Sequence, residues 1–302
     1  MISRSFVAFS VLASVALVVA PAHAQDSVKI GVLADLSASS VDIGGPGSIA
    51  AVNMAVKDFS GRVLGKPIVV VSADHQMKPD IGSAIAAKWF DAEGVDVIVD
   101  VPVSSVALAV SKIAQQRKRL LMVTAATVAA LTGGACSPNT IHWSDDTNAL
   151  AKGTTFAAVK SGYKSWYFIS VDFVFGHMLE NAARKVIETN GGKFLGSVRV
   201  PINTSDYSSF VLQAQASKAQ VVGLNVVGSD FINAVRQASE FGLVAGGQKL
   251  LGFLVYVSDI HSLGLKSTQG LLVTESFYWD TNEKTRAFAK RFMAVRKVMP
   301  TK

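Results

Sequence analysis

The stretch VDVIVDVPVSSVALAVSKIAQQ, residues 95–116, carries the pattern that decides the fold. Residues 95–99 (VDVIV) are short and apolar except for Asp96, which is typical of a buried β-strand. Residues 104–116 place Val106, Val110 and Ile113 on one stripe of a helix. A buried strand, a short loop and an amphipathic helix together predict one β-α unit.

The same unit recurs along the chain. Further strands are predicted at residues 28–33, 68–72, 120–123, 165–170, 194–200, 221–226, 250–255 and 270–275. Helices are predicted after residue 47 through residue 59 and at residues 79–91, 148–160, 175–190, 208–216, 230–241 and 282–297. This alternation predicts an α/β protein with parallel sheets flanked by helices. Because two such series meet near residues 140–146, we expect two lobes that face each other across a cleft.

The first 24 of the 302 residues have the features of a cleaved leader. A charged start is followed by an apolar run at residues 6–20, which is too short to cross a bilayer, and by small residues at 22–24. We therefore expect residues 1–24 to be a signal peptide, Gln25 to begin the mature protein, and the location to be periplasmic. The first mature residue is not cysteine, and no later apolar run reaches about 18 residues, so we expect a soluble mature chain without a lipid anchor.

Charge and motif chemistry argue against a nucleic-acid binder and against an enzyme. The chain has 29 basic and 22 acidic residues, a mild excess without a basic stripe. Residues 43–47 (IGGPG) lack the spacing of a dinucleotide or phosphate loop. The histidines stand alone, so we expect no metal and no cofactor. The single cysteine, Cys136, cannot form an internal disulfide, and we expect a loop thiol there.

Small hydroxyl residues follow two of the predicted strands. In parallel sheets ligands bind beyond the carboxyl ends of the strands, where Ser104 and Ser105 follow one strand and Ala126 and Thr127 follow the next. Helix N-termini there present free N–H groups that suit a carboxylate. Plain helix capping explains the same residues, because serine and threonine are preferred caps.

Several stretches together resemble the Leu/Ile/Val-type substrate-binding proteins of ABC transporters, the type I periplasmic binding proteins. They are VKIGVL (28–33), SADHQ (72–76), DVPVSS (100–105), LTG (131–133) with CSP (136–138), FGH (175–177) and TESFYWD (274–280). Several of them match a branch associated with aromatic and other hydrophobic acids. The resemblance implies a two-lobed fold with lobe 1 at residues 25–140, lobe 2 at 141–270, and a return into lobe 1 at 271–302.

The resemblance also implies a ligand site. In this family lobe 1 binds the ligand carboxylate through residues that match Ser104, Ser105, Ala126 and Thr127, and lobe 2 supplies aromatic contacts at positions matching Phe173 and Phe175. We add Val227, Leu254 and Tyr278 to the expected binding set. In amino-acid binders an acidic residue receives the ligand ammonium. Residues 252–256 contain no acid at the matching place, and Asp259 is the acid nearby that would weaken this inference if it took that role. Because a buried ammonium without a counter-charge is costly, an aromatic or aliphatic acid is expected rather than a branched-chain amino acid.

The expected function is delivery of a small carboxylate to an inner-membrane ABC permease after hinge closure, by a monomer. A ligand-sensing module of the same fold that regulates a partner protein is the alternative. Three departures from the family pattern bear on the site and the fold. Residues 35–40 lack an aromatic that relatives have, residues 225–230 are less rich in Gly and Asn, and relatives continue beyond residue 302. We therefore expect a C-terminally truncated chain with reduced stability.

Overall fold

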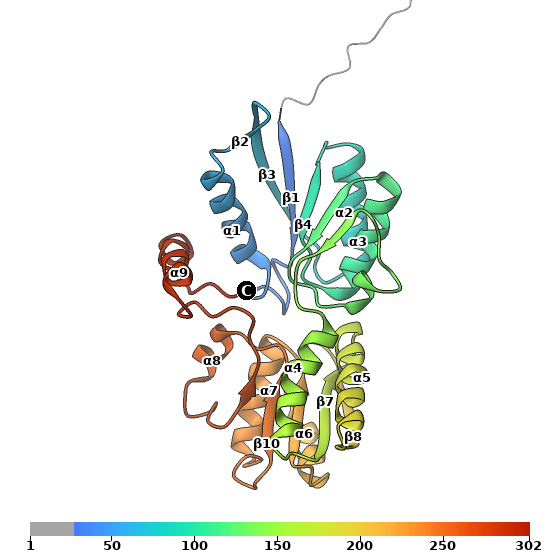
Figure 1. Ribbon diagram of the computed structural model, residues 1–302, viewed down its shortest axis with the longest axis vertical. Helices are drawn as coiled ribbons and strands as arrows, with labels where there is room; N and C mark the ends of the chain where they lie inside the picture. Colours follow the sequence, from blue (N-terminus) through green and yellow to red (C-terminus); the bar gives the residue numbers. More distant parts are fainter. Residues whose placement is uncertain (1–26) are drawn as a thin grey trace, which may run out of the picture.

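The computed structural model describes residues 27–302, so the expected leader at residues 1–24 lies outside the described part. These residues form two lobes, each built on its own sheet (Figure 1). The sheet of lobe 1 has the order β2-β3-β1-β4-β5-β6 and is parallel except for β2, which pairs antiparallel with β3. Its strands are β1 (Val28–Ala34), β2 (Arg62–Val63), β3 (Lys66–Asp74), β4 (Val97–Asp100), β5 (Leu120–Val123) and β6 (Thr140–His142).

The helices of lobe 1 lie on both sides of this sheet. They are α1 (Gly45–Asp58), α2 (Pro79–Asp91), α3 (Ser104–Arg117) and the short 3-10 helix η1 (Ala129–Thr132). The core of lobe 1 lies on the side of α2 and α3, where Trp89 and Phe90 of α2 meet Val106 and Val110 of α3. On the opposite side, α1 buries only Gly45 and Ala50.

Lobe 2 has a fully parallel sheet of order β11-β10-β9-β7-β8. Its strands are β7 (Ser165–Val171), β8 (Lys193–Val200), β9 (Val221–Asn225), β10 (Lys249–Gly252) and β11 (Leu272–Val273), and its helices are α4 (Thr147–Lys160), α5 (Val174–Thr189), α6 (Ser208–Ala216), α7 (Ser229–Glu240) and α8 (Val257–Leu263). The buried cluster of lobe 2 contains side chains from α4, α5, α6 and α7, so both faces of the sheet are covered. The predicted α/β architecture with two lobes is confirmed.

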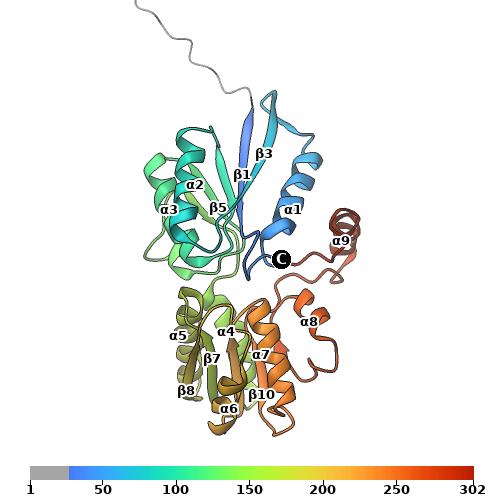
Figure 2. The ribbon, with the colours of Figure 1, turned by 180° about the vertical axis from the view of Figure 1, so that it is seen from behind.

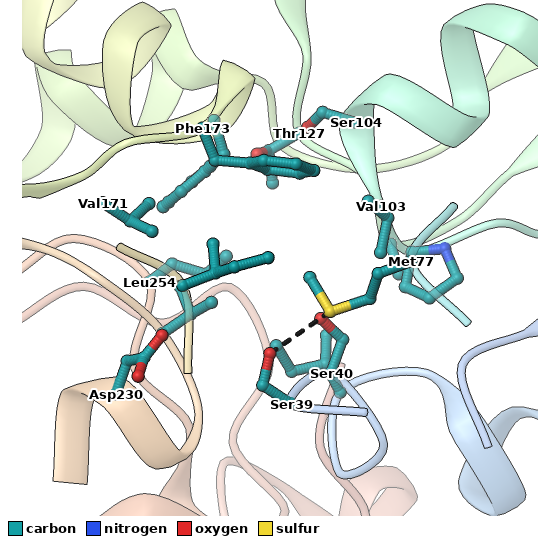
Figure 3. Close-up of a pocket in the computed structure, with 16 residues that line it drawn as sticks. Ser39, Ser40, Met77, Val103, Ser104, Thr127, Val171, Phe173, Asp230 and Leu254 are labelled. Atoms are coloured by element: carbon teal, nitrogen blue, oxygen red, sulfur yellow. Dashed lines mark hydrogen bonds between the residues drawn. The ribbon is translucent and has the colours of Figure 1, made fainter. Parts of the chain in front are cut away.

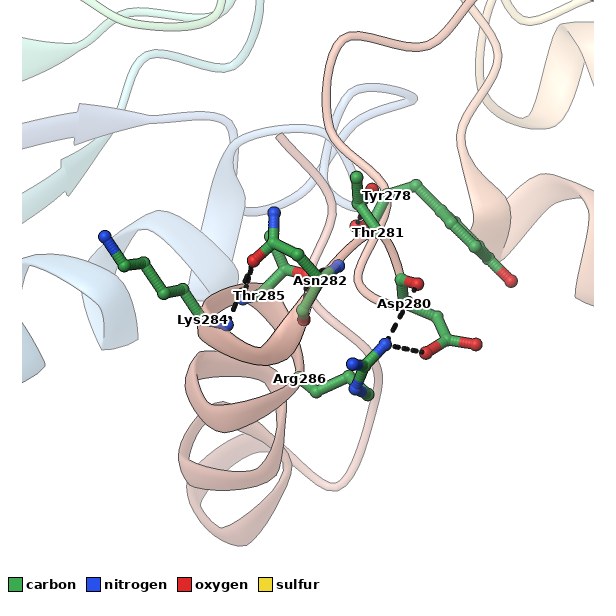
Figure 4. Close-up of polar contacts among 7 residues, drawn as sticks. All are labelled: Tyr278, Asp280, Thr281, Asn282, Lys284, Thr285 and Arg286. Atoms are coloured by element: carbon green, nitrogen blue, oxygen red, sulfur yellow. Dashed lines mark hydrogen bonds and ion pairs between the residues drawn. The ribbon is translucent and has the colours of Figure 1, made fainter.

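The chain passes between the lobes twice within the described part, first between β6 and α4 and again between β11 and α9 (Glu283–Arg296). Helix α9 lies beside α1 of lobe 1, as the view from behind also shows (Figure 2). Asn282 begins α9, because its side chain accepts the amide hydrogens of Lys284 and Thr285 at 2.9 and 3.1 Å (Figure 4). Near the first crossing, Lys302 donates to Asp145 at 2.7 Å.

The structure shifts two expected boundaries and adds elements. The boundary expected after residue 140 falls inside β6, whose residues Ile141 and His142 pair with β5 of lobe 1. The return expected at residue 271 begins later, because β11 pairs with β10 and Thr154 of α4 donates to Thr274 at 2.8 Å. The strand expected at residues 250–255 ends at Gly252, and β2, β6, η1 and α8 were not predicted. These additional elements are two to seven residues long, too short for a periodic pattern.

None of the helices in residues 27–302 combines the length and the apolar character that crossing a bilayer requires.

Candidate functional site

A pocket lies between the lobes, at the carboxyl ends of strands from both sheets (Figure 3). Its cavity measures about 50 Å³. That is smaller than the cavity of about 150 Å³ that holds benzene in an engineered protein core. A ring-sized ligand therefore needs the lobes to move apart before it can enter.

Ser104 and Thr127 form the polar part of the lobe 1 wall. Ser104 is the first residue of α3 and is buried, so its hydroxyl and the unpaired amide groups of the first turn lie at the pocket. Thr127 belongs to the loop after β5, and its carbonyl accepts the Thr147 amide at 2.7 Å. His142 holds the same loop through a 2.7 Å hydrogen bond to the Ala126 carbonyl. Two hydroxyl groups and a helix N-terminus therefore meet where a carboxylate would be stabilised.

The loop between β1 and α1 contributes Ser39, Ser40 and Ile43. Asp35 shapes this loop, because its fully buried carboxylate accepts the backbone amides of Ala38 at 2.9 Å and Ser40 at 2.8 Å. Such side-chain to backbone bonds replace the hydrogen bonds that a helix or strand would supply. An aspartate directly after β1 thus fixes the conformation of this part of the pocket wall.

Lobe 2 supplies an apolar wall. Phe173 and Phe175 come from the start of α5, Val227 follows β9, and Leu254 follows β10. The two walls are in close contact, because a Cβ atom added to Gly228 would lie 2.6 Å from the carbonyl oxygen of Ser39 in lobe 1. Gly228 also has φ of +58°, which glycine adopts most readily. The lobes are therefore closed around the pocket.

Asp230 is the one charged side chain among the pocket-lining residues of the described part of the chain. It is buried, and burial raises the pKa of its carboxyl group, opposed by the backbone amides of Asn203 and Thr204. Asp259 does not line the pocket, because its carboxylate accepts the Tyr256 amide at 2.9 Å at the start of α8. Burial raises the pKa of Asp259 to about 6.

The structure brings together six of the nine residues expected from the sequence at this pocket: Ser104, Thr127, Phe173, Phe175, Val227 and Leu254. Ser105 is next to Ser104 in α3 but does not line the cavity, and Ala126 is buried with its carbonyl committed to His142. Tyr278 lies outside the pocket. It is 47% exposed and lines a separate cavity beside α8, because the chain leaves lobe 2 at that point.

Sequence reasoning missed Met77, Ile202 and Asp230 as wall residues. Met77 and Ile202 follow β3 and β8, so the rule that ligands bind beyond strand ends could have found them. Met77 is turned toward the site by a backbone with φ of +56°, and its amide donates to His75 Nδ1 at 3.0 Å. Asp230 is the last residue of the segment 225–230, and no local sequence pattern marks it as a wall residue.

Residues 27–302 contain no group of three or more potential metal ligands close enough to hold an ion. Cys136 is exposed.

Comparison with known proteins places the chain in a family. The family model described as "Periplasmic binding protein" matches residues 27–302. A Leu/Ile/Val-binding protein homolog 6 from Brucella melitensis is 26% identical over 89% of this chain and 68% of its own length. A periplasmic binding protein from Burkholderia mallei is 46% identical, with a TM-score of 0.89 over 91% of this chain and 73% of the other. A branched-chain amino acid ABC transporter periplasmic ligand-binding protein from Burkholderia xenovorans LB400 is 41% identical. Its TM-score is 0.80 over 91% of this chain and 74% of the other.

The match over the whole described part confirms the resemblance seen in the sequence motifs, and the two-lobed fold agrees with it. The members are transport components rather than enzymes, and the relatives identify this chain as the substrate-binding protein of an ABC transporter. The chain belongs to the periplasmic binding protein family.

Proposed function

We propose that the chain binds a small aromatic or aliphatic carboxylate between its lobes in the periplasm and delivers it to an inner-membrane ABC permease. The observation that carries this proposal is the division of the pocket: Ser104, Thr127 and the start of α3 on one wall, and apolar side chains on the other. Hydroxyl groups and free helix amides stabilise a carboxylate without a basic residue.

Leu254 supports an acid rather than a branched-chain amino acid. It follows β10 in the loop where amino-acid binders of the family carry the acid for the ligand ammonium, and it lines the pocket. A leucine there gives no counter-charge, and leaving an ammonium without one in a buried site costs several kcal/mol. Asp230 is the remaining acid at the pocket. It lies in lobe 2, across the cavity from Ser104 and Thr127, whereas the ammonium of an α-amino acid is one carbon away from its carboxylate.

A thermal-shift screen of the mature chain tests the proposal. Ligands that bind the native state raise the midpoint of unfolding by mass action. We expect the midpoint to rise with small aromatic or aliphatic acids, and to rise much less with leucine, isoleucine or valine. A rise with the amino acids alone would contradict the proposed ligand class.

The hydroxyl groups are tested in the same assay. We expect Ser104→Ala and Thr127→Ala each to lower affinity about 10- to 100-fold, since each removes one hydrogen bond to a charged group. Ser105→Ala is the matched control, because Ser105 is adjacent in α3 but does not line the cavity. Equal losses in all three variants would mean that the start of α3 is disturbed rather than that a ligand contact is lost.

A further inference from the structure

Asp230 lies across the pocket from the hydroxyl groups that would bind the ligand carboxylate. Ser104 and Thr127 belong to lobe 1, whereas Asp230 is in the first turn of α7 in lobe 2 (Figure 3). Figure 3 shows Asp230 and Leu254 on one side of the cavity and Ser104 and Thr127 on the other. The pocket therefore has a donor end in lobe 1 and an acceptor end in lobe 2.

One oxygen of Asp230 has a partner and the other has none. Oδ2 accepts the Asn203 amide at 3.0 Å. Oδ1 has no hydrogen-bond partner among the described residues. Water cannot readily replace that partner, because only 4% of the residue is exposed. A buried acceptor without a donor is destabilising, so a ligand that supplies the donor gains affinity.

Tyr207 is the protein group that could compete for this acceptor. Its hydroxyl is buried without a partner, and burial, together with the nearby Asp230 carboxylate, raises the pKa of Tyr207. The ring is fixed by its edge contact with Phe210, with the ring centroids 5.9 Å apart. No hydrogen bond joins Tyr207 to Asp230 in the described structure, so Oδ1 has no donor from the protein.

We propose that Asp230 determines specificity by accepting a hydrogen bond from a donor at the end of the ligand opposite its carboxylate. This inference rests on the proposed function. In an α-amino acid the ammonium is one carbon from the carboxylate, so the two groups cannot be placed at opposite ends of the pocket. A carboxylic acid with a hydroxyl group at its far end satisfies both ends.

Matched ligand pairs test this on the unmodified protein. Isothermal titration calorimetry would compare benzoate with 4-hydroxybenzoate and butyrate with 4-hydroxybutyrate, and 4-methoxybenzoate would supply the oxygen without the donor. We expect the hydroxylated member of at least one pair to bind about tenfold or more tightly than its parent. We expect no such gain from the methoxy compound.

Asp230→Asn then assigns the preference to this residue. We expect the ratio of the two affinities, hydroxylated acid to parent acid, to fall at least about threefold in this variant. Asp259→Asn is the matched control, because Asp259 is also a buried acid that accepts a backbone amide in the first turn of a lobe 2 helix, away from the pocket.

The outcomes separate the two proposals. Equal affinity within every pair, or an equal gain from the methoxy compound, would overturn the role of Asp230 and leave carboxylate binding intact. Equal weakening of both members of a pair by Asp230→Asn would show that Asp230 only supports the loop at Asn203. If no carboxylate binds, the proposed function fails and this inference fails with it. If Asp230→Asn does not fold, the ligand pairs on the unmodified protein decide.

Discussion

In lobe 2 one buried cluster includes side chains of α4, α5, α6 and α7 and so covers both faces of the sheet, whereas in lobe 1 the buried cluster lies on the α2–α3 side. Phe168 packs against Trp166, Phe194 and Phe253 in lobe 2, with ring centroids 5.4–6.3 Å apart. The opposite side of lobe 1 is covered by α1 and α9, and α9 buries only Ala289 and Phe292. Burial on both faces removes more apolar surface from water, so lobe 2 should be the more stable half.

The polar groups differ as well. Glu180 in lobe 2 is buried but accepts hydrogen bonds from Ser170, Ser197 and Arg199 at 2.6, 3.0 and 2.8 Å. Asp100 in lobe 1 is equally buried and has no cation, and Thr124 donates to it at 3.2 Å. Glu180 is therefore held as a carboxylate by three donors, one of them a cation, whereas Asp100 has no cation to offset its burial.

The largest expected effect comes from the aromatic core of lobe 2. We expect Phe168→Ala to lower the free energy of unfolding by about 3–5 kcal/mol, because it leaves a cavity between three rings. Phe292→Ala in α9 should cost only about 1–2 kcal/mol, because that ring borders open cavities on two sides. Urea unfolding measures both, and a larger loss for Phe292→Ala would reverse the comparison of the lobes.

The next effect concerns Asp100, a buried acid of lobe 1 that has no cation partner in the described part of the chain. Burial raises the pKa of Asp100 to about 7, opposed by hydrogen bonds from Ser48 and Thr124. The unfolded chain releases this proton near pH 4, so between pH 4 and pH 7 the folded state binds more protons and stability falls as the pH rises. The contribution from Asp100 reaches at most about 4 kcal/mol.

Asp100→Asn should remove that contribution. We expect the fall in stability from pH 4 to pH 7 to be shallower in the variant, as measured by urea unfolding at several pH values. Glu275 also has a pKa raised by burial to about 7 and acts in the same direction, so the difference between variant and parent is the quantity to follow. Parallel pH profiles for the two proteins would show that Asp100 does not carry this effect.

The contact between the lobes gives a smaller effect. Gly228→Ala would place a methyl group 2.6 Å from the Ser39 carbonyl, so we expect it to hold the lobes apart and weaken ligand binding about tenfold. Gly264→Ala is the control, because Gly264 also has a positive φ but has no atom within 4 Å of the added Cβ. Small-angle X-ray scattering should show a larger radius of gyration with ligand for Gly228→Ala only. Similar scattering for both variants would mean that strain, not the contact between lobes, causes the loss.

The smallest effect is expected where α9 meets α1. Arg291 and Asp58 form an ion pair at 2.6 Å, but both side chains are about half exposed. Exposed pairs contribute little, so Asp58→Ala should change the free energy of unfolding by less than about 0.5 kcal/mol. A loss of 2 kcal/mol or more in urea unfolding would show that α9 is held by charge rather than by Phe292.

Much of this fold follows from local patterns, because strands and helices with buried faces repeat apolar residues at fixed spacing. The segment at residues 95–116 became β4 and α3 with shifts of one or two residues. Short elements such as β6 and α8 were not predictable, because β6 is an edge strand defined by its pairing with β5 and α8 by the contact of Asp259 with Tyr256.

The site was predictable where residues lie directly at strand ends. Ser104 and Thr127 follow β4 and β5, so the rule for parallel sheets brought them to the pocket. Asp230 depends on how α7 is placed against the loop at Asn203, and Tyr278 leaves the site because the second crossing turns away beside α8. Those two outcomes are set by tertiary packing, which one sequence does not contain.

The most direct test of the account is calorimetric titration of benzoate and butyrate into the mature protein and into the double variant Ser104→Ala, Thr127→Ala. We predict saturable binding of at least one acid to the parent protein and a loss of at least about 30-fold in the double variant, with unfolding midpoints that stay close. Unchanged affinity in the double variant would contradict the claim that lobe 1 binds the ligand carboxylate through these two hydroxyl groups.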